Sequence, residues 1–196
     1  MQTVKNEWLE LLQKRHVLKE GHFLLTSGRH TKQYLQCALL FQQPHDAERV
    51  GQAMAEPFHH AKVDAVVGPA MGGVVAAHEV ARALGCRAIF TERENGKMTL
   101  RRGFQLEKGE RVVVVEDVVT TGGSVKEALE VVEAHGAEVL GISSLVNRSV
   151  HGSPFTYPFH PLVTVHIETY EPDACPLCKA GAEPPVKPGS RKTVKH

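Results

Sequence analysis

The sequence lacks the features that mark exported, membrane-spanning or nucleic-acid-binding proteins. Its N-terminus has no apolar signal core, and no hydrophobic run is long enough to cross a bilayer. The formal net charge is only +1, which gives no general attraction to nucleic acid or to a membrane surface. Only four cysteines are present, and without a secretory segment they favour a reducing compartment. We therefore expect a cytoplasmic protein with no nucleic-acid or membrane partner.

Two common nucleotide-binding motifs are also missing. No Gly-Lys-Ser/Thr sequence is present, which excludes a Walker loop, and no Gly-x-Gly-x-x-Gly follows a predicted strand. Any phosphate site must therefore be built from another kind of loop.

What is present is a chain of ordinary globular composition. Its 196 residues are 42% hydrophobic, enough for one domain with a sizeable core. Apolar patterns predict the order strand, helix, strand, polar loop, strand, helix, strand across residues 63–146. This alternation indicates the α/β class, with a parallel sheet flanked by helices on both faces.

The most informative stretch is residues 112–124, Val-Val-Val-Val-Glu-Asp-Val-Val-Thr-Thr-Gly-Gly-Ser. Four valines suit a strand that is buried on both faces of a parallel sheet. Glycines and hydroxyls then precede a predicted helix, whose first-turn N–H groups attract a phosphate. Glu116 and Asp117 do not favour the phosphate itself, but they accept hydrogen bonds from sugar hydroxyls. The pattern indicates a ribose 5-phosphate site; solvated acids at the end of a buried strand are the structural alternative.

This stretch resembles the signature of the type I phosphoribosyltransferases, which bind 5-phosphoribosyl 1-pyrophosphate (PRPP). The chain is most similar to the orotate branch, over about residues 21–149, and its Cys-Pro-Leu-Cys ending resembles one bacterial group. The resemblance implies a single type I phosphoribosyltransferase domain over 1–196, with a core at about 46–149 and a small hood from about 1–45 and 150–196. It also implies Mg²⁺ as cofactor, and a homodimer in which a catalytic loop is shared across subunits.

The resemblance assigns two loops to PRPP. The ribose and 5′-phosphate would be bound by Glu116, Asp117, Val118, Val119, Thr120, Thr121, Gly122, Gly123 and Ser124. The pyrophosphate would be bound by Pro69, Ala70, Met71, Gly72 and Gly73, where the family often has a strained or cis peptide. Gly72 replaces a family lysine, so backbone groups and metal would hold the pyrophosphate; a loop that only packs a helix on the sheet is the alternative. Mg²⁺ would bind through PRPP rather than directly by a side chain, with Glu116 and Asp117 as candidate contacts.

Residues 92–109 show no apolar period and predict a long polar loop. The resemblance identifies this segment as the mobile catalytic loop, with Arg93 and Lys97 at its basic positions. Together with Asp117, these two are the expected catalytic residues. For Arg101 and Arg102 a solvated charge run is an equally good interpretation.

Arg148 follows a strand predicted at 139–146, and an arginine at the carboxyl end of such a strand faces the ligand crevice. Its planar fork suits a carboxylate. The resemblance assigns it to the carboxylate of orotate, although Asn147 replaces the family aspartate and Thr26 replaces a lysine near the base. The other expected orotate contacts are Thr120, Ser27, Gly28 and Tyr34. A structural salt bridge is the alternative for Arg148, and a hairpin with a hydrogen-bonded tyrosine is the alternative for Tyr34.

Cys175 and Cys178 form a Cys-x-x-Cys pair, which is half of a common zinc site. His160 and His166 are nearby in sequence, but no second cysteine pair exists. Zinc is therefore the less favoured interpretation, and the sequence leaves metal binding by this pair open.

The implied reaction is transfer of the 5-phosphoribosyl group from PRPP to orotate, giving orotidine 5′-monophosphate and pyrophosphate in pyrimidine (UMP) biosynthesis. Three alternatives remain at this level. The chain could act on another base, could be a regulatory sensor that keeps the PRPP fold without catalysis, or could bind nucleotides without chemistry. The retained Lys97 and the absence of a basic nucleic-acid-binding patch argue against the second alternative, and the presence of both the phosphate loop and the basic loop argues against the third.

Overall fold

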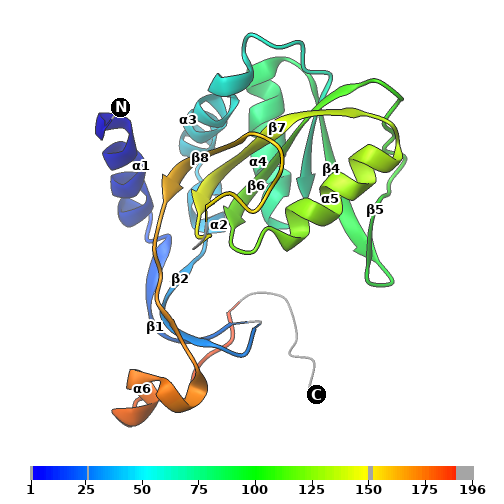
Figure 1. Ribbon diagram of the computed structural model, residues 1–196. Coiled ribbons are helices and arrows are strands. Elements are labelled where there is room, and N and C mark those ends of the chain that lie inside the picture. The colour runs from blue at the N-terminus through cyan, green and yellow to red at the C-terminus, as the bar shows by residue number, and fades with distance from the viewer. Residues whose placement is uncertain (1, 26, 150–151, 189–196) are drawn as a thin grey trace.

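The computed structural model describes residues 2–25, 27–149 and 152–188 (Figure 1). Thr26 lies outside these residues, as does the end of the C-terminal tail. Within the described residues, no helix has both the length and the apolar character needed to cross a membrane. The chain forms a six-stranded central sheet and a three-stranded hood sheet.

The central sheet has the strand order β5-β4-β3-β6-β7-β8. In chain order its strands are β3 (Ala65–Pro69), β4 (Arg87–Glu94), β5 (Lys97–Leu100), β6 (Arg111–Val119), β7 (Glu138–Asn147) and β8 (Phe159–Thr164). All neighbouring pairs are parallel except β4 with β5, which is antiparallel. The predicted parallel sheet is confirmed, and its register places the carboxyl ends of β3, β6 and β7 at one edge.

The valine run of β6 is buried completely because alternate side chains enter two different cores. Val113 and Val115 pack against the helices α3 (Pro44–Ala55) and α4 (Gly72–Leu84). Val112 and Val114 pack against α5 (Gly123–Ala134) on the other face. Figure 1 shows these helices on opposite sides of the sheet. A strand covered on both faces has no polar side to expose, which explains its unbroken apolar sequence.

The segment predicted as a long loop, 92–109, begins with a β-hairpin, so that prediction is wrong for residues 92–100, whereas residues 101–109 contain no helix or strand. β4 continues to Glu94, turns at Asn95 and Gly96, and pairs with β5 in a hairpin. Asn95 and Gly96 have φ angles of 52° and 83°, which a two-residue hairpin turn requires at both positions. The segment also holds two buried apolar side chains, Met98 and Leu106, and Leu106 belongs to the core cluster that includes α5.

The hood consists of the antiparallel strands β1 (Leu18–Leu24), β2 (His30–Leu35) and β9 (Thr169–Tyr170). The other elements not yet given are α1 (Gln2–Lys14), α2 (Ala38–Phe41), the 3-10 turns η1 (Glu56–Phe58) and η2 (Pro172–Ala174), and α6 (Pro176–Lys179). Some of these lie on the core side: α1 buries Trp8, Leu11 and Leu12 against it. Figure 1 shows the β1–β2 hairpin extending away from the central sheet, with α6 at its far end.

Several predicted boundaries shift by a few residues. The helices expected at 6–16 and 46–60 are α1 and α3, and the strand expected at 162–168 is β8, which begins and ends earlier. β8 pairs with β7 in the central sheet, although residues 150–196 were assigned to the hood. The extra strand is built from Phe159, Leu162 and Val163, whose side chains pack on the two cores.

Candidate functional site

The predicted PRPP loops follow β3 and β6, and Arg148 follows β7, so all of them lie at one edge of the central sheet. In an open parallel sheet the crevice outside the carboxyl ends of the strands is the usual place for a ligand. Strand register alone therefore brings together residues that are nearly 80 positions apart in the sequence (69 and 148).

The loop after β6 forms a small cavity of about 130 Å³ at the start of α5. It is lined by residues 118–125 together with Glu116, Arg93 and Glu127. Gly122 has a φ of 76° and is the N-cap of α5, and as a glycine it has no side chain of its own to cap this end. The first-turn N–H groups of α5 thus face a polar hollow, which is the arrangement that binds a phosphate. This placement agrees with the 5′-phosphate role predicted for Thr120 to Ser124.

The ring of Phe155, which lies outside residues 112–124, packs against the β6–α5 loop. A Cβ atom at Gly122 would lie 2.7 Å from the Phe155 ring, so the loop and the ring pack with no room for a larger residue. Neither Phe155 nor Glu127 was predicted as a site residue. Glu127 lies on α5 just beyond the motif and lines the cavity, whereas Phe155 comes from the segment between β7 and β8, so no pattern within residues 112–124 points to it.

The loop between β3 and α4 lies directly against the two acids. The peptide bond from Ala70 to Met71 is cis, as the resemblance led us to expect. A Cβ atom at Gly72 would lie 2.4 Å from Oδ1 of Asp117. The missing lysine at this position therefore has a physical reason, because in this backbone the Asp117 carboxyl fills the space of any side chain on Gly72.

Asp117 is a partly buried acid with few compensating contacts. Burial raises the pKa of its carboxyl above the ordinary value, although a hydrogen bond with the Glu116 side chain and others from backbone N–H groups oppose the shift. The Val118 N–H donates to Asp117 Oδ1 at 2.8 Å, and the Asp117 N–H donates to Glu116 Oε1 at 3.2 Å. A carboxylate that is shielded from water and has no cation beside it can accept hydrogen bonds from ligand hydroxyls or bind a cation of the ligand.

Arg93 and Lys97, the two predicted basic catalytic residues, lie on the two strands of the β4–β5 hairpin and have different surroundings. Arg93 borders the cavity of the β6–α5 loop, and its guanidinium binds the Glu127 carboxylate at 2.9 and 2.7 Å. Lys97 begins β5 beside the hairpin turn and is exposed. Arg101 and Arg102 form ion pairs with Glu92, and Arg101 also pairs with Glu94. Both arginines therefore pair at the protein surface with carboxylates of β4.

Arg148 lies in the crevice, and one nitrogen of its side chain has no hydrogen-bond partner. Its backbone N–H donates to the Val119 carbonyl at 2.7 Å, which joins it to the end of β6. Its Nε atom is buried without a hydrogen-bond partner, and no carboxylate among the described residues forms an ion pair with it. Burial lowers the pKa of the guanidinium, with the Tyr34 hydroxyl opposing this shift. The salt-bridge alternative thus has no partner in the described part of the chain.

Tyr34 connects the hood to this crevice. Burial raises the pKa of its hydroxyl, and the charge of Asp117 raises it further while Arg148 lowers it. Tyr34 is therefore near both residues, and its contact with the base stays a prediction. Ser27 and Gly28 lie in the exposed turn between β1 and β2, and no hydrogen bond or ion pair within the described chain joins that turn to Arg148.

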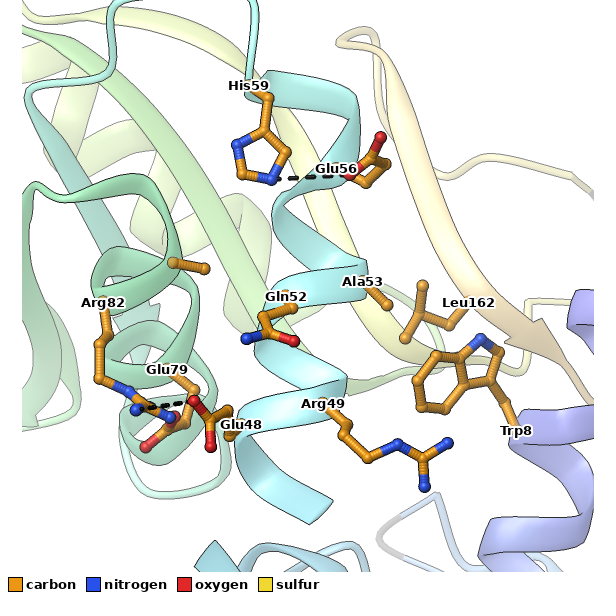
Figure 2. Close-up of a pocket in the computed structure, with 11 residues that line it drawn as sticks. Trp8, Glu48, Arg49, Gln52, Ala53, Glu56, His59, Glu79, Arg82 and Leu162 are labelled. Atoms are coloured by element: carbon orange, nitrogen blue, oxygen red, sulfur yellow. Dashed lines mark hydrogen bonds and ion pairs between the residues drawn. The ribbon is translucent and has the colours of Figure 1, made fainter. Parts of the chain in front are cut away.

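A much larger cavity, of about 820 Å³, lies elsewhere, between α1, α3, α4 and β8 (Figure 2). Its charged groups pair with one another: Arg82 with Glu79 at 3.0 Å, and His59 with Glu56 at 3.6 Å. None of its lining residues comes from the loops that follow β3, β6 or β7. Its size therefore does not make it the site of the chemistry predicted from the sequence.

Comparisons with known proteins agree with this geometry. Residues 39–157 match the model of the phosphoribosyl transferase domain family. The chain is 53% identical over 188 residues to the orotate phosphoribosyltransferase of Caldanaerobacter subterraneus subsp. tengcongensis, which covers 96% of this chain and 98% of that relative.

Solved structures give the same result for the fold. The orotate phosphoribosyltransferase from Aeropyrum pernix superposes with a TM-score of 0.67 at 26% identity, covering 80% of this chain and 92% of that one. The UMP synthase of Leishmania donovani superposes with a TM-score of 0.68, also at 26% identity, over 81% of this chain. This chain spans only 36% of that longer protein.

Proposed function

Because this chain belongs to the family of orotate phosphoribosyltransferases, we propose that its crevice transfers the 5-phosphoribosyl group of PRPP to N1 of orotate and releases pyrophosphate. The observation that carries the choice of base is Arg148. A guanidinium in a partly dry crevice without a carboxylate partner calls for an anionic ligand, and the carboxylate of orotate is one. A neutral base would leave this charge uncompensated.

We further propose how the residues divide the work on PRPP. The β6–α5 loop and Arg93 hold the 5′-phosphate, while Glu116 and Asp117 accept hydrogen bonds from the ribose hydroxyls. The loop at 69–73 offers backbone groups to the pyrophosphate. As the bond to pyrophosphate breaks, positive charge grows on the ribose, and two nearby carboxylates stabilise it. The hood, through Tyr34, covers the base and excludes water.

The two adjacent carboxylates also fit a magnesium ion, which prefers oxygen ligands. Glu116 and Asp117 are the side chains that would contact it, and the ion would supply charge neutralisation for the pyrophosphate. The magnesium requirement, a homodimer and a cytoplasmic location are parts of this proposal. They rest on the family resemblance and, for location, on composition.

The assay that tests the function uses purified protein with PRPP, Mg²⁺ and orotate, and follows the fall in orotate absorbance. Adenine, hypoxanthine and uracil are run in parallel. We expect orotate to be consumed much faster than any of the other bases. Turnover of a different base alone would keep the PRPP site and refute the role of Arg148. PRPP binding without any turnover would favour a regulatory sensor.

Lys97→Ala is expected to lower kcat by about 10²-fold and to change PRPP affinity much less. The exposed ammonium at the hairpin turn is available to the departing pyrophosphate, whose charge grows only as the bond breaks. Steady-state kinetics together with PRPP titration of the free enzyme separate the two effects. Lys108→Ala is the matched control, because Lys108 is exposed beside Gly136 at the opposite end of the sheet. A loss confined to PRPP affinity would remove the transition-state role.

A further inference from the structure

Four metal-binding side chains from distant parts of the chain meet in the hood. His22 lies on β1, His30 begins β2, Cys175 precedes α6 and Cys178 is within it. One ligand atom from each residue lies within 4.8 Å of all the others. All four residues lie outside residues 39–157, the part that matches the family model. The cluster therefore belongs to the hood and not to the shared catalytic core.

The distances between the ligand atoms fit a tetrahedron around one ion. With zinc at about 2.0–2.1 Å from nitrogen and ~2.3 Å from sulfur, tetrahedral angles require roughly 3.3 Å between two nitrogens and roughly 3.6 Å from nitrogen to sulfur. His22 Nε2 lies 3.1 Å from His30 Nδ1 and 3.6 Å from each cysteine sulfur. The Cys178 sulfur lies 3.3 Å from His30 Nδ1.

The surrounding contacts prepare these atoms to bind a metal. The Nδ1 atom of His22 lies 2.8 Å from the Glu183 carbonyl, which can only accept, so Nδ1 carries the proton and Nε2 presents its lone pair to the cluster. The backbone N–H groups of Leu177 and Cys178 hydrogen-bond to the Cys175 sulfur. Both thiols are free rather than joined in a disulfide, and Cys175 is completely buried.

We propose that His22, His30, Cys175 and Cys178 bind one zinc ion that ties the C-terminal segment to the β1–β2 hairpin. Two thiolates and two imidazoles are the ligand set that zinc prefers in tetrahedral sites. With four protein ligands no position remains open for water or substrate, so the ion has a structural role. It fixes the hairpin that carries Tyr34 at one end and the turn with Ser27 and Gly28 at the other.

His160 and His166, the histidines noted as near this cysteine pair in sequence, are not its partners. His160 packs its ring against Phe58, with ring centroids 5.6 Å apart, and His166 is exposed. Neither belongs to the cluster. The partners come instead from a hairpin about 150 residues earlier in the chain (Cys175 to His22 spans 153 positions).

Metal analysis of the full-length protein, purified without added chelator and dialysed, tests the proposal. We expect about one zinc per chain. After removal of zinc under reducing conditions, added Co²⁺ should give the intense visible bands of four-coordinate cobalt and a thiolate-to-cobalt charge-transfer band. Cys178→Ser should lower retained zinc at least about tenfold. Cys86→Ser, which changes a thiol outside the cluster, should retain it fully.

A variant that keeps four metal ligands distinguishes loss of a ligand from misfolding of the chain. His30→Cys is expected to retain the metal and to strengthen the thiolate charge-transfer band of the cobalt form. Three results would overturn the proposal: purified protein that neither holds zinc nor binds Co²⁺, zinc content unchanged in Cys178→Ser, or thiol titration showing a Cys175–Cys178 disulfide. None of these readouts depends on catalytic activity, so a negative result for zinc would leave the proposed function unaffected.

Discussion

Asp117→Asn is expected to lower kcat by about 10²–10³-fold while the chain stays folded. The amide has the size of the carboxyl and still accepts hydrogen bonds, but it lacks the negative charge that faces the developing ribose cation. Steady-state kinetics with saturating PRPP and orotate measure the loss. Unchanged turnover would remove Asp117 from the ribose site.

The stability of the same variant gives an independent check. A carboxyl with a raised pKa contributes stability below its ordinary pKa and loses that contribution as the pH rises through the raised value. At neutral pH the Asp117 carboxylate is therefore a cost to the fold, chiefly through burial. We expect Asp117→Asn to have an unchanged or higher Tm at neutral pH.

Asp64→Asn is the matched control, with the same chemical change at the opposite edge of the sheet. The Arg111 N–H donates to Asp64 Oδ2 at 2.9 Å and holds the pKa of that carboxyl below its ordinary value. Its contribution to stability is present above the ordinary pKa and is lost as the pH falls through the lowered value. Asp64→Asn should therefore lower Tm at neutral pH and leave kcat unchanged, the reverse of Asp117→Asn.

Gly72→Ala tests the position of the Asp117 carboxyl, because Gly72 lies against it in the neighbouring loop. The new methyl group would overlap the carboxyl, which must then move. A displaced carboxylate should lower kcat in the same direction as Asp117→Asn, by about tenfold or more. Full activity in Gly72→Ala would show that the position of this carboxyl does not matter for the reaction.

Arg148→Met is expected to lower kcat/KM for orotate by about 10²–10³-fold, because the base carboxylate loses its charge-assisted hydrogen bonds. Methionine keeps much of the length and apolar stem of the side chain, so the crevice stays filled. The variant should not lose activity toward uracil, which has no carboxylate, and the ratio of orotate to uracil turnover should fall.

The control for this prediction is Arg87→Met, which removes an arginine paired with Glu110 at the amino end of β4. It should leave the ratio of orotate to uracil turnover unchanged. PRPP titration of the free Arg148→Met enzyme separates base recognition from general damage, since we expect PRPP affinity to stay within about threefold. Equal losses for orotate and PRPP would assign Arg148 a structural role instead.

Much of the site could be predicted because its chemistry is local in sequence. The strand, acids, glycines and helix start of residues 112–124 follow one another directly, and the structure places them as a strand, a loop and a helix N-terminus around a polar cavity. The hairpin at β4–β5 could also have been predicted, because Asn95-Gly96 is a strong turn signal between Arg93 and Met98. The many charged residues of that segment mask the turn signal, although several of them pair with one another on the hairpin surface.

The sequence by itself determined the α/β class, the two loops and the residue types that face the ligand, since these depend on apolar period and on backbone freedom at glycine. Only the tertiary structure decided which distant groups meet. It placed Asp117 in the space beside Gly72, left Arg148 without a carboxylate among the described residues, and joined His22 and His30 to Cys175 and Cys178. Such contacts depend on strand order and on how the hood folds back, and no local pattern in a chain encodes a distance across 150 residues.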